Sequence, residues 1–176
     1  AQLQAFGCNA NGFSGADGNL LLAHKRQHAT IDYGFVGDVD AVNEKYLKTL
    51  LSKNVTPVIC PITHDGKGQL LNTNADTIAQ EIAKALSIDY DVQLIYSFEK
   101  RGVLLNADDE STLIKSINPT YYQHLKSEGV IYAGMLPKLD NAFAALQSGV
   151  GKVIIGRAEQ LQQLIDNTEG TTIVNE

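Results

Sequence analysis

The sequence has few cysteines, no long hydrophobic run and no recognisable leader. Cys8 and Cys60 lie far apart, and neither belongs to a CxxC pair or a Cys/His cluster, so a disulfide framework or a structural zinc site is not expected. No apolar stretch approaches the roughly 18 residues that a membrane-spanning helix needs, and the first residues lack the pattern of a signal peptide. We therefore expect two reduced thiols in a cytoplasmic protein with no membrane partner.

Positive charge is also scarce. The 176 residues carry a formal net charge of -6, whereas a non-specific nucleic-acid or membrane-surface binder needs a basic face. There is no internal repeat, no low-complexity segment and no GxxxxGK[ST] nucleotide loop. With 44% hydrophobic residues, the composition is that of a globular protein, and the length suits one domain over residues 1–176.

Apolar patterning predicts strands and helices that alternate along most of the chain. Short apolar and β-branched runs predict strands at 3–8, 20–25, 31–36, 55–62, 92–97, 152–156 and 170–174, with a rim loop at 9–19. Apolar residues at three- and four-residue spacing predict helices at 39–52, 76–86, 118–128, 139–146 and 158–166. This alternation favours an α/β fold, a three-layer αβα sandwich with a mainly parallel sheet. The 20–36 region would form an antiparallel hairpin at its margin.

The segment 71–76 places polar side chains between an apolar strand and an amphipathic helix. Asn72, Asn74 and Asp76 follow the run at 55–62, which is typical of a strand buried on both faces, and precede the helix at 76–86. A helix N-terminus favours a bound carboxylate or phosphate. Asn and Asp at this position also serve simply as helix caps, so both interpretations stay open.

Two later loops are candidates for binding an anion or a nucleotide. The strand at 92–97 runs into the charged loop at 99–104, a usual place for a nucleotide in an α/β sheet; a plain strand exit is the alternative. At 129–138 a Gly-containing loop meets a helix start beside Lys138, which suits phosphate, although a solvated surface lysine has the same pattern. His64 is expected to be a solvated turn residue rather than a base.

Five blocks, in this order, resemble the acetylglutamate kinases of the amino acid kinase family. They are Ser14–Gly18, Tyr33–Val39, Asn72–Asp76, Gly134–Lys138 and Gly170–Ile173. The resemblance runs nearly end to end. Its Asn-x-Asn-Ala-Asp block distinguishes this branch from the aspartate, glutamate and uridylate kinases of the same family.

The resemblance implies phosphoryl transfer from MgATP to the γ-carboxylate of N-acetyl-L-glutamate, or of a related N-acyl-L-glutamate, in arginine biosynthesis. It implies that Asn72 and Asn74 bind the amino-acid substrate. It also implies that Asp76 orients lysines and that Lys138 stabilises the transferring phosphoryl group. The residues implied to line the ATP site are Glu99, Lys100, Arg101, Gly102, Val103, Leu104, Val130, Ile131, Tyr132, Gly134 and Met135. Mg²⁺ would accompany the ATP, and no metal ligand in the protein is implied.

The chain departs from the family pattern at two levels. The Lys-x-Gly-Gly strand exit, the His-Gly-Gly-Gly loop and the substrate-binding Arg of the family's N-terminal half have no counterpart here. We therefore expect the nucleotide-binding part of such a kinase, inactive by itself and homo-oligomeric when intact. Locally, Glu99 stands where the family has an Asp that meets the ribose, and Ala133 stands where it often has Gly. The alternatives are a non-catalytic nucleotide-binding or regulatory module, or another amino acid kinase such as a carbamate or uridylate kinase.

Overall fold

The computed structural model describes residues 1–131 and 134–175. The chain divides into two compact units, Ala1–Ala85 and Leu86–Glu176, called unit 1 and unit 2 and described separately here. A single domain over the whole chain stays a prediction. Among the described residues, no helix combines the length and the apolar character that crossing a membrane requires.

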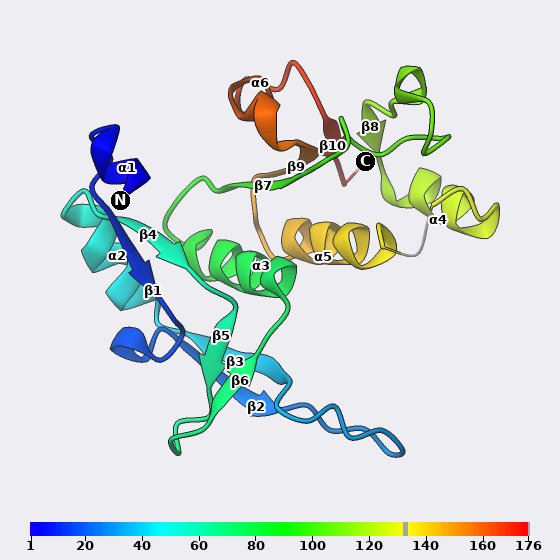
Figure 1. The fold of residues 1–176 in the computed structure, drawn as a ribbon. Helices are drawn as coiled ribbons and strands as arrows, with labels where there is room; N and C mark the ends of the chain where they lie inside the picture. Colours follow the sequence, from blue (N-terminus) through cyan, green and yellow to red (C-terminus); the bar gives the residue numbers. More distant parts are fainter. Residues whose placement is uncertain (132–133, 176) are drawn as a thin grey trace. The chain divides into compact units, whose positions relative to one another are not determined.

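Unit 1 is built around a four-stranded sheet. Its strands are β2 (Leu21–Lys25), β3 (Gly37–Val42), β5 (Ile62–His64) and β6 (Leu70–Asn72), in the order β3-β2-β5-β6. β2 pairs antiparallel with β3 and parallel with β5, and β5 pairs antiparallel with β6. The predicted hairpin is therefore confirmed, and Figure 1 shows the long loop that joins β2 to β3 extending beyond the sheet.

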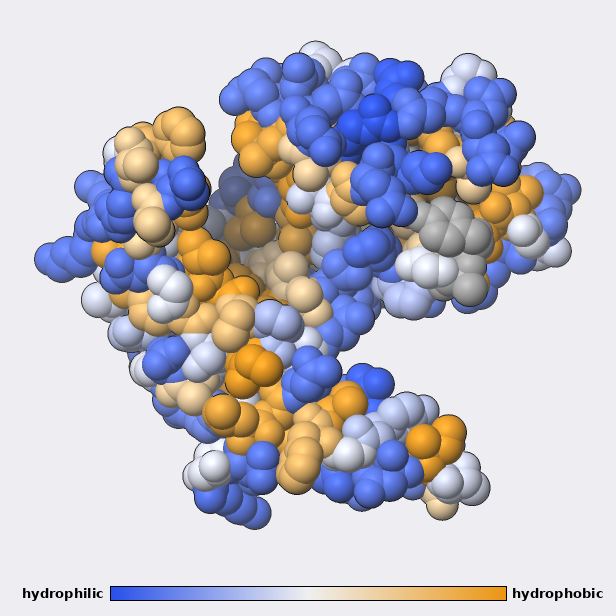
Figure 2. Space-filling view, in the orientation of Figure 1, coloured by the Kyte–Doolittle hydropathy of each residue, from blue (hydrophilic) through white to orange (hydrophobic). Residues whose placement is uncertain are grey.

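The rest of unit 1 contains a second, smaller sheet and three helices. β1 (Ala10–Phe13) and β4 (Thr56–Ile59) form a two-stranded parallel sheet, and the helices are α1 (Gln2–Ala5), α2 (Glu44–Ser52) and α3 (Ala75–Leu86), with a 3-10 turn at Asp17–Asn19. Hydrophobic side chains are exposed around the small sheet: Phe6 is 86% exposed and Val58 47%, and Figure 2 shows hydrophobic surface over this region. No further described strand pairs with either edge of this sheet.

Unit 2 has one mixed sheet between helices. Its strands are β7 (Gln93–Phe98), β8 (Ser116–Ile117), β9 (Lys152–Arg157) and β10 (Thr171–Ile173), in the order β7-β9-β10-β8, with 3-10 turns at Glu110–Thr112 and Ala158–Gln160. β7 runs parallel to β9. α5 (Leu136–Gln147) and α6 (Leu161–Ile165) lie on opposite sides of this sheet (Figure 1), and α4 (Pro119–Ser127) lies beside α5.

The predicted fold class is confirmed, because both units combine helices with sheets that contain parallel pairs. The elements that match their predicted ranges closely are β2, β7, β9, β10, α3, α4 and α5. The predicted inner face of α5 is also confirmed: Leu139 and Ala142 are fully buried, and Phe143 is 8% exposed. These segments carry the strongest apolar periodicity, which fixes the buried face wherever the element packs.

Several element predictions in unit 1 are wrong. Residues 3–8 form α1 and a turn at Gly7, whose φ is 78°, and the strand begins only at Ala10. The first part of the predicted helix at 39–52 is β3, because it pairs with β2; α2 begins after Asn43, whose side chain accepts a hydrogen bond from the Tyr46 backbone N–H at 3.2 Å.

The run predicted as one strand at 55–62 covers β4 and only the first residue of β5. Pro61 has no N–H to donate, and at this point the chain passes from β4 in the small sheet to β5 in the large one. β4 alternates exposed and half-buried residues and is not buried on both faces. Similarly, the second strand of the hairpin begins at Gly37 instead of 31, and the helix predicted at 158–166 is a 3-10 turn followed by α6.

Candidate active site

In unit 1, the polar segment 72–76 is fixed through one of its own residues, Thr73, which forms a buried hydrogen-bonded pair with Thr63. Thr73 is 3% exposed, and its Oγ1 lies 2.9 Å from the Oγ1 of Thr63 and donates to the Gly37 carbonyl at 3.1 Å. A Cβ added at Gly37 would lie 2.8 Å from the Thr73 Oγ1, so only glycine fits there. Because Thr73 points inward, its neighbours Asn72 and Asn74 are exposed.

Asn74 is the N-cap of α3. Its Oδ1 accepts hydrogen bonds from the backbone N–H groups of Asp76 at 2.8 Å and Thr77 at 3.2 Å. These hydrogen bonds identify Asn74, and not Asp76, as the N-cap. Asp76 lies in the first turn of the helix. Since the oxygen of Asn74 is used for capping, a ligand can be bound only by the Nδ2 amide, which is a donor.

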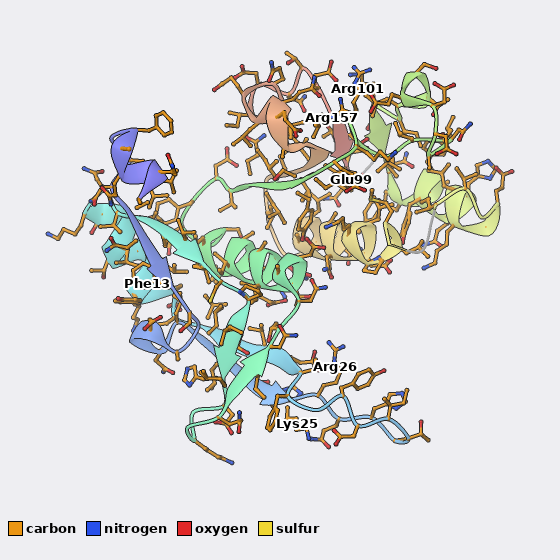
Figure 3. All side chains as sticks on the ribbon, in the orientation of Figure 1. Phe13, Lys25, Arg26, Glu99, Arg101 and Arg157 are labelled. Carbon is orange, nitrogen blue, oxygen red and sulfur yellow. The ribbon has the colours of Figure 1, made fainter. Side chains whose placement is uncertain are left out.

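In unit 2, two parallel strands bring charged residues together at their carboxyl ends. Phe98 of β7 lies opposite Arg157 of β9, and the Nε of Arg157 donates to the Glu99 carbonyl at 3.2 Å. The Nη2 of Arg157 pairs with the Glu110 carboxylate. Figure 3 labels Glu99, Arg101 and Arg157 in this region. The sequence analysis did not single out Arg157. The pattern that could have indicated it is a positively charged residue at the end of a strand that runs parallel to the strand at 92–97.

A second arginine ties the same loop to the start of β10. The Nη2 of Arg101 lies 3.0 and 2.9 Å from the two carboxylate oxygens of Glu169. This hydrogen bonding, with a further contribution from the charge of Lys115, holds the pKa of Glu169 below its ordinary value. The side chain of Arg101 therefore anchors the loop through Glu169, and a ligand would have to contact the backbone groups of Arg101 instead of its charge. Lys100 also bonds within the loop, to the Ala107 carbonyl at 3.1 Å.

Thr171 joins both ends of the loop at 99–114. Its side chain is fully buried, and its Oγ1 accepts from the Val103 N–H at 2.8 Å and donates to the Ile114 carbonyl at 2.6 Å. A Cβ added at Gly102 would lie 2.6 Å from that same Oγ1. Gly102, Val103 and Leu104 are accordingly buried within unit 2, so they shape the loop by packing.

Lys138 lies in the first turn of α5. This helix has no acidic residue in its first turn, and its N-cap, Met135, makes no side-chain capping bond. The Nζ of Lys138 lies over the ring of Tyr96, 5.7 Å from the ring centre. Free N–H groups at a helix start together with a lysine favour an anion such as phosphate.

The other residues expected at the nucleotide site have mixed exposure. Ile131 and Met135 are buried, Val130 is half-buried and Gly134 is exposed. Tyr132, which the resemblance places at this site, and Ala133 lie outside the described residues.

The prediction that His64 is a solvated turn residue is wrong. It is the last residue of β5, its Nδ1 accepts from the Gly66 N–H at 3.1 Å, and its Nε2 is buried without a hydrogen-bond partner among the described residues. Both cysteines are free thiols. In the described part of the chain, no three His, Cys, Asp or Glu side chains are grouped as a metal site would require.

Comparison with known proteins gives the chain's relatives. The model of the amino acid kinase family matches residues 1–157. The acetylglutamate kinase of Cytophaga hutchinsonii is 52% identical, with 99% of this chain and 67% of that protein aligned. That of Bacteroides fragilis is 49% identical, over 98% of this chain and 64% of that protein.

A solved structure has a similar fold over nearly the whole chain. The crystal structure of smu.665 from Streptococcus mutans UA159 aligns with a TM-score of 0.81 and 27% identity, over 99% of this chain and 64% of that one. The chain thus spans about two thirds of the length of the relatives it matches. By its sequence and its fold, it belongs to the amino acid kinase family, in the branch of the acetylglutamate kinases.

Proposed function

We propose that this chain forms the nucleotide-binding part, together with one side of the acceptor site, of an acetylglutamate kinase. The reaction is phosphoryl transfer from ATP to the γ-carboxylate of N-acetyl-L-glutamate or a related N-acyl-L-glutamate, in arginine biosynthesis. The observation that carries the proposal is that the family's Asn-x-Asn-Ala-Asp block presents Asn72 and Asn74, both exposed, at the start of α3. Amide donors beside a helix N-terminus suit a substrate that bears carboxylates.

On the acceptor side, the proposal gives each polar residue of segment 72–76 one task. Asn72 donates to the α-carboxylate side of the substrate, and Asn74 donates through its Nδ2, since its oxygen caps α3. The nucleophile is an ionised carboxylate, so no general base is needed. Asp76, in the first turn of α3, therefore orients lysines instead of removing a proton. This agrees with phosphoryl transfer in general, where positioning and charge stabilisation carry the rate.

On the donor side, Lys138 and the start of α5 receive the phosphates of ATP. The adenine and ribose lie against the loop at 99–104 and the segment 130–135, where Arg157 fixes the Glu99 backbone and leaves its exposed carboxylate to accept from the ribose hydroxyls. Mg²⁺ arrives with the nucleotide. Such ions are commonly held by phosphate oxygens, water and one or two carboxylates.

We also propose that turnover requires a further part of the protein. This chain spans 67% of the Cytophaga hutchinsonii relative, and the small β1–β4 sheet has two edges with no described strand partner beside exposed hydrophobic side chains. A two-stranded sheet is rarely stable by itself, and parallel sheets are usually covered on both faces. The intact protein is proposed to be a cytoplasmic homo-oligomer.

The test uses a chimera in which this chain replaces the matching part of the Cytophaga hutchinsonii enzyme. With MgATP and N-acetyl-L-glutamate, we expect an acyl phosphate that hydroxylamine traps as a hydroxamate. Free glutamate and carbamate serve as control acceptors, and neither should support turnover. Nucleotide binding without any trapped product would refute the kinase and favour the non-catalytic module.

Asn74 provides a test that separates capping from substrate binding. Asn74→Ala should lower the free energy of unfolding of the chain by about 1 kcal/mol, because the α3 cap is lost. Asn74→Asp keeps a capping oxygen but removes the amide donor and adds a negative charge, so the KM of the chimera for N-acetyl-L-glutamate should rise at least about tenfold at nearly unchanged stability. An unchanged KM in Asn74→Asp would mean that Asn74 is a cap and nothing more.

A further inference from the structure

The segment that carries Asn72 and Asn74 is fastened to two other strands through its backbone. The backbone N–H of Thr73 donates to the carbonyl of Pro61, just before β5, at 3.0 Å. The backbone N–H of Asn72 donates to the carbonyl of Phe35, shortly before β3, at 2.7 Å. The end of β6 is therefore attached to the starts of both β5 and β3.

The side chain of Thr73 repeats both attachments. Its Oγ1 donates to the carbonyl of Gly37, the first residue of β3, at 3.1 Å and lies 2.9 Å from the Oγ1 of Thr63 on β5. A threonine hydroxyl has one proton to donate, so the Thr63 hydroxyl is the donor to Thr73. The two hydroxyls thus form a directed chain of hydrogen bonds from β5, past the end of β6, to β3.

This chain of bonds fixes which side chains face outward. Thr73 is 3% exposed and Thr63 is fully buried, whereas Asn72 and Asn74 are exposed. A shift of one residue in the pairing of β6 would turn every side chain to the opposite face, burying the two amides. Two valines would fill nearly the same volume, but hydrogen bonds also fix distance and direction, and a buried hydroxyl that loses its bond is costly.

We propose that Thr73 and Thr63 form a positioning pair for Asn72 and Asn74. The inference rests on the proposed function of the two asparagines and deepens it: the buried hydroxyls hold both amide groups in the orientation that the acceptor substrate requires. The pair belongs to the acceptor side of the site, so its loss should affect the binding of N-acetyl-L-glutamate and not that of ATP.

The structural part is measured by NMR on the 176-residue chain. The side-chain amide signals of Asn72 and Asn74, assigned by their loss in Asn72→Asp and Asn74→Asp, should move in Thr63→Val. Residue 63 is remote from both asparagines in sequence, so this movement cannot be an effect of neighbouring residues. Thr63→Val also keeps the bond from Thr73 to Gly37 and is the milder variant for folding. Thr63→Ser, which keeps the hydroxyl, should leave the signals near their wild-type positions.

The functional part is a comparison of KM values in the chimera. Thr73→Val and Thr63→Val should each raise the KM for N-acetyl-L-glutamate about threefold to tenfold, which corresponds to the loss of one hydrogen bond. The KM for ATP should not change, and Thr73→Ser should restore the wild-type value. Thr49→Val is the matched control, because the hydroxyl of Thr49 is exposed and bonds within α2, to the Lys45 carbonyl at 2.9 Å.

Three results would overturn the inference. They are unmoved amide signals in Thr63→Val, valine variants that lose stability but keep the KM for N-acetyl-L-glutamate, and equal KM increases in Thr73→Ser and Thr73→Val. If the wild-type chimera forms no hydroxamate, the proposed function fails, and the amide signals still decide whether the hydroxyl pair positions Asn72 and Asn74.

Discussion

Replacing Lys138 by methionine should lower the kcat of the chimera about a hundredfold. Methionine keeps most of the length and apolar character of the side chain, so the change removes chiefly the charge. A cation aimed at a transferring phosphoryl group acts like one oxyanion-hole donor, whose loss raises the barrier by about 3 kcal/mol. The measurement is the rate of hydroxamate formation at saturating MgATP and N-acetyl-L-glutamate.

The matched control is Lys126→Met. Lys126 also lies over an aromatic ring, that of Tyr122, but its ammonium group is on α4 and its side chain is 46% exposed. This variant should keep the wild-type kcat. A Lys138→Met protein that retains most of its kcat and shows only a raised KM for ATP would instead assign Lys138 to ground-state binding.

The second large effect is expected from Thr171→Val, a change of nearly equal volume. It leaves the Val103 N–H and the Ile114 carbonyl, both in the buried part of unit 2, without the side-chain oxygen that now joins them. Each unsatisfied buried polar group typically costs about 1–3 kcal/mol, so the free energy of unfolding should fall by about 2–5 kcal/mol. Chemical denaturation of the 176-residue chain measures this.

Amide hydrogen exchange gives the same prediction a local readout. The Val103 amide should exchange faster in Thr171→Val, because its acceptor has gone, and the loop at 99–114 should loosen with it. Thr172→Val is the control: its hydroxyl bonds the exposed Asn167 side chain at 2.8 Å, so stability should change by less than about 0.5 kcal/mol. Equal effects of the two substitutions would show that Thr171 contributes only volume.

Much of the candidate site was visible in the sequence because its residues are neighbours there. Asn72, Asn74 and Asp76 lie within one strand-to-helix connection, and Lys138 lies at the start of a helix with clear periodicity. Local rules for capping and apolar spacing are sufficient for such segments. They left open which residue caps α3, and the hydrogen bonds of the Asn74 oxygen decide it.

The residues that sequence reasoning missed act over long distances in the chain. Arg157 reaches a carbonyl 58 residues away, and Thr171 reaches one amide 68 residues away. Strand pairing brings them to the loop at 99–114, and no local pattern records that pairing. The errors in unit 1 have a similar origin, since residues 37–42 became a strand by pairing with β2 against their helical spacing.

By itself, the sequence determined the fold class, the family and the short polar segments that carry the proposed chemistry, because these depend on periodicity and on residues close together in the chain. Only the tertiary structure decided that Thr73 turns inward over Gly37, that Arg101 anchors a loop instead of offering its charge, and that Tyr96 faces Lys138. Each of these depends on which strands pair and which faces are buried, and that is settled by packing among segments far apart in the chain.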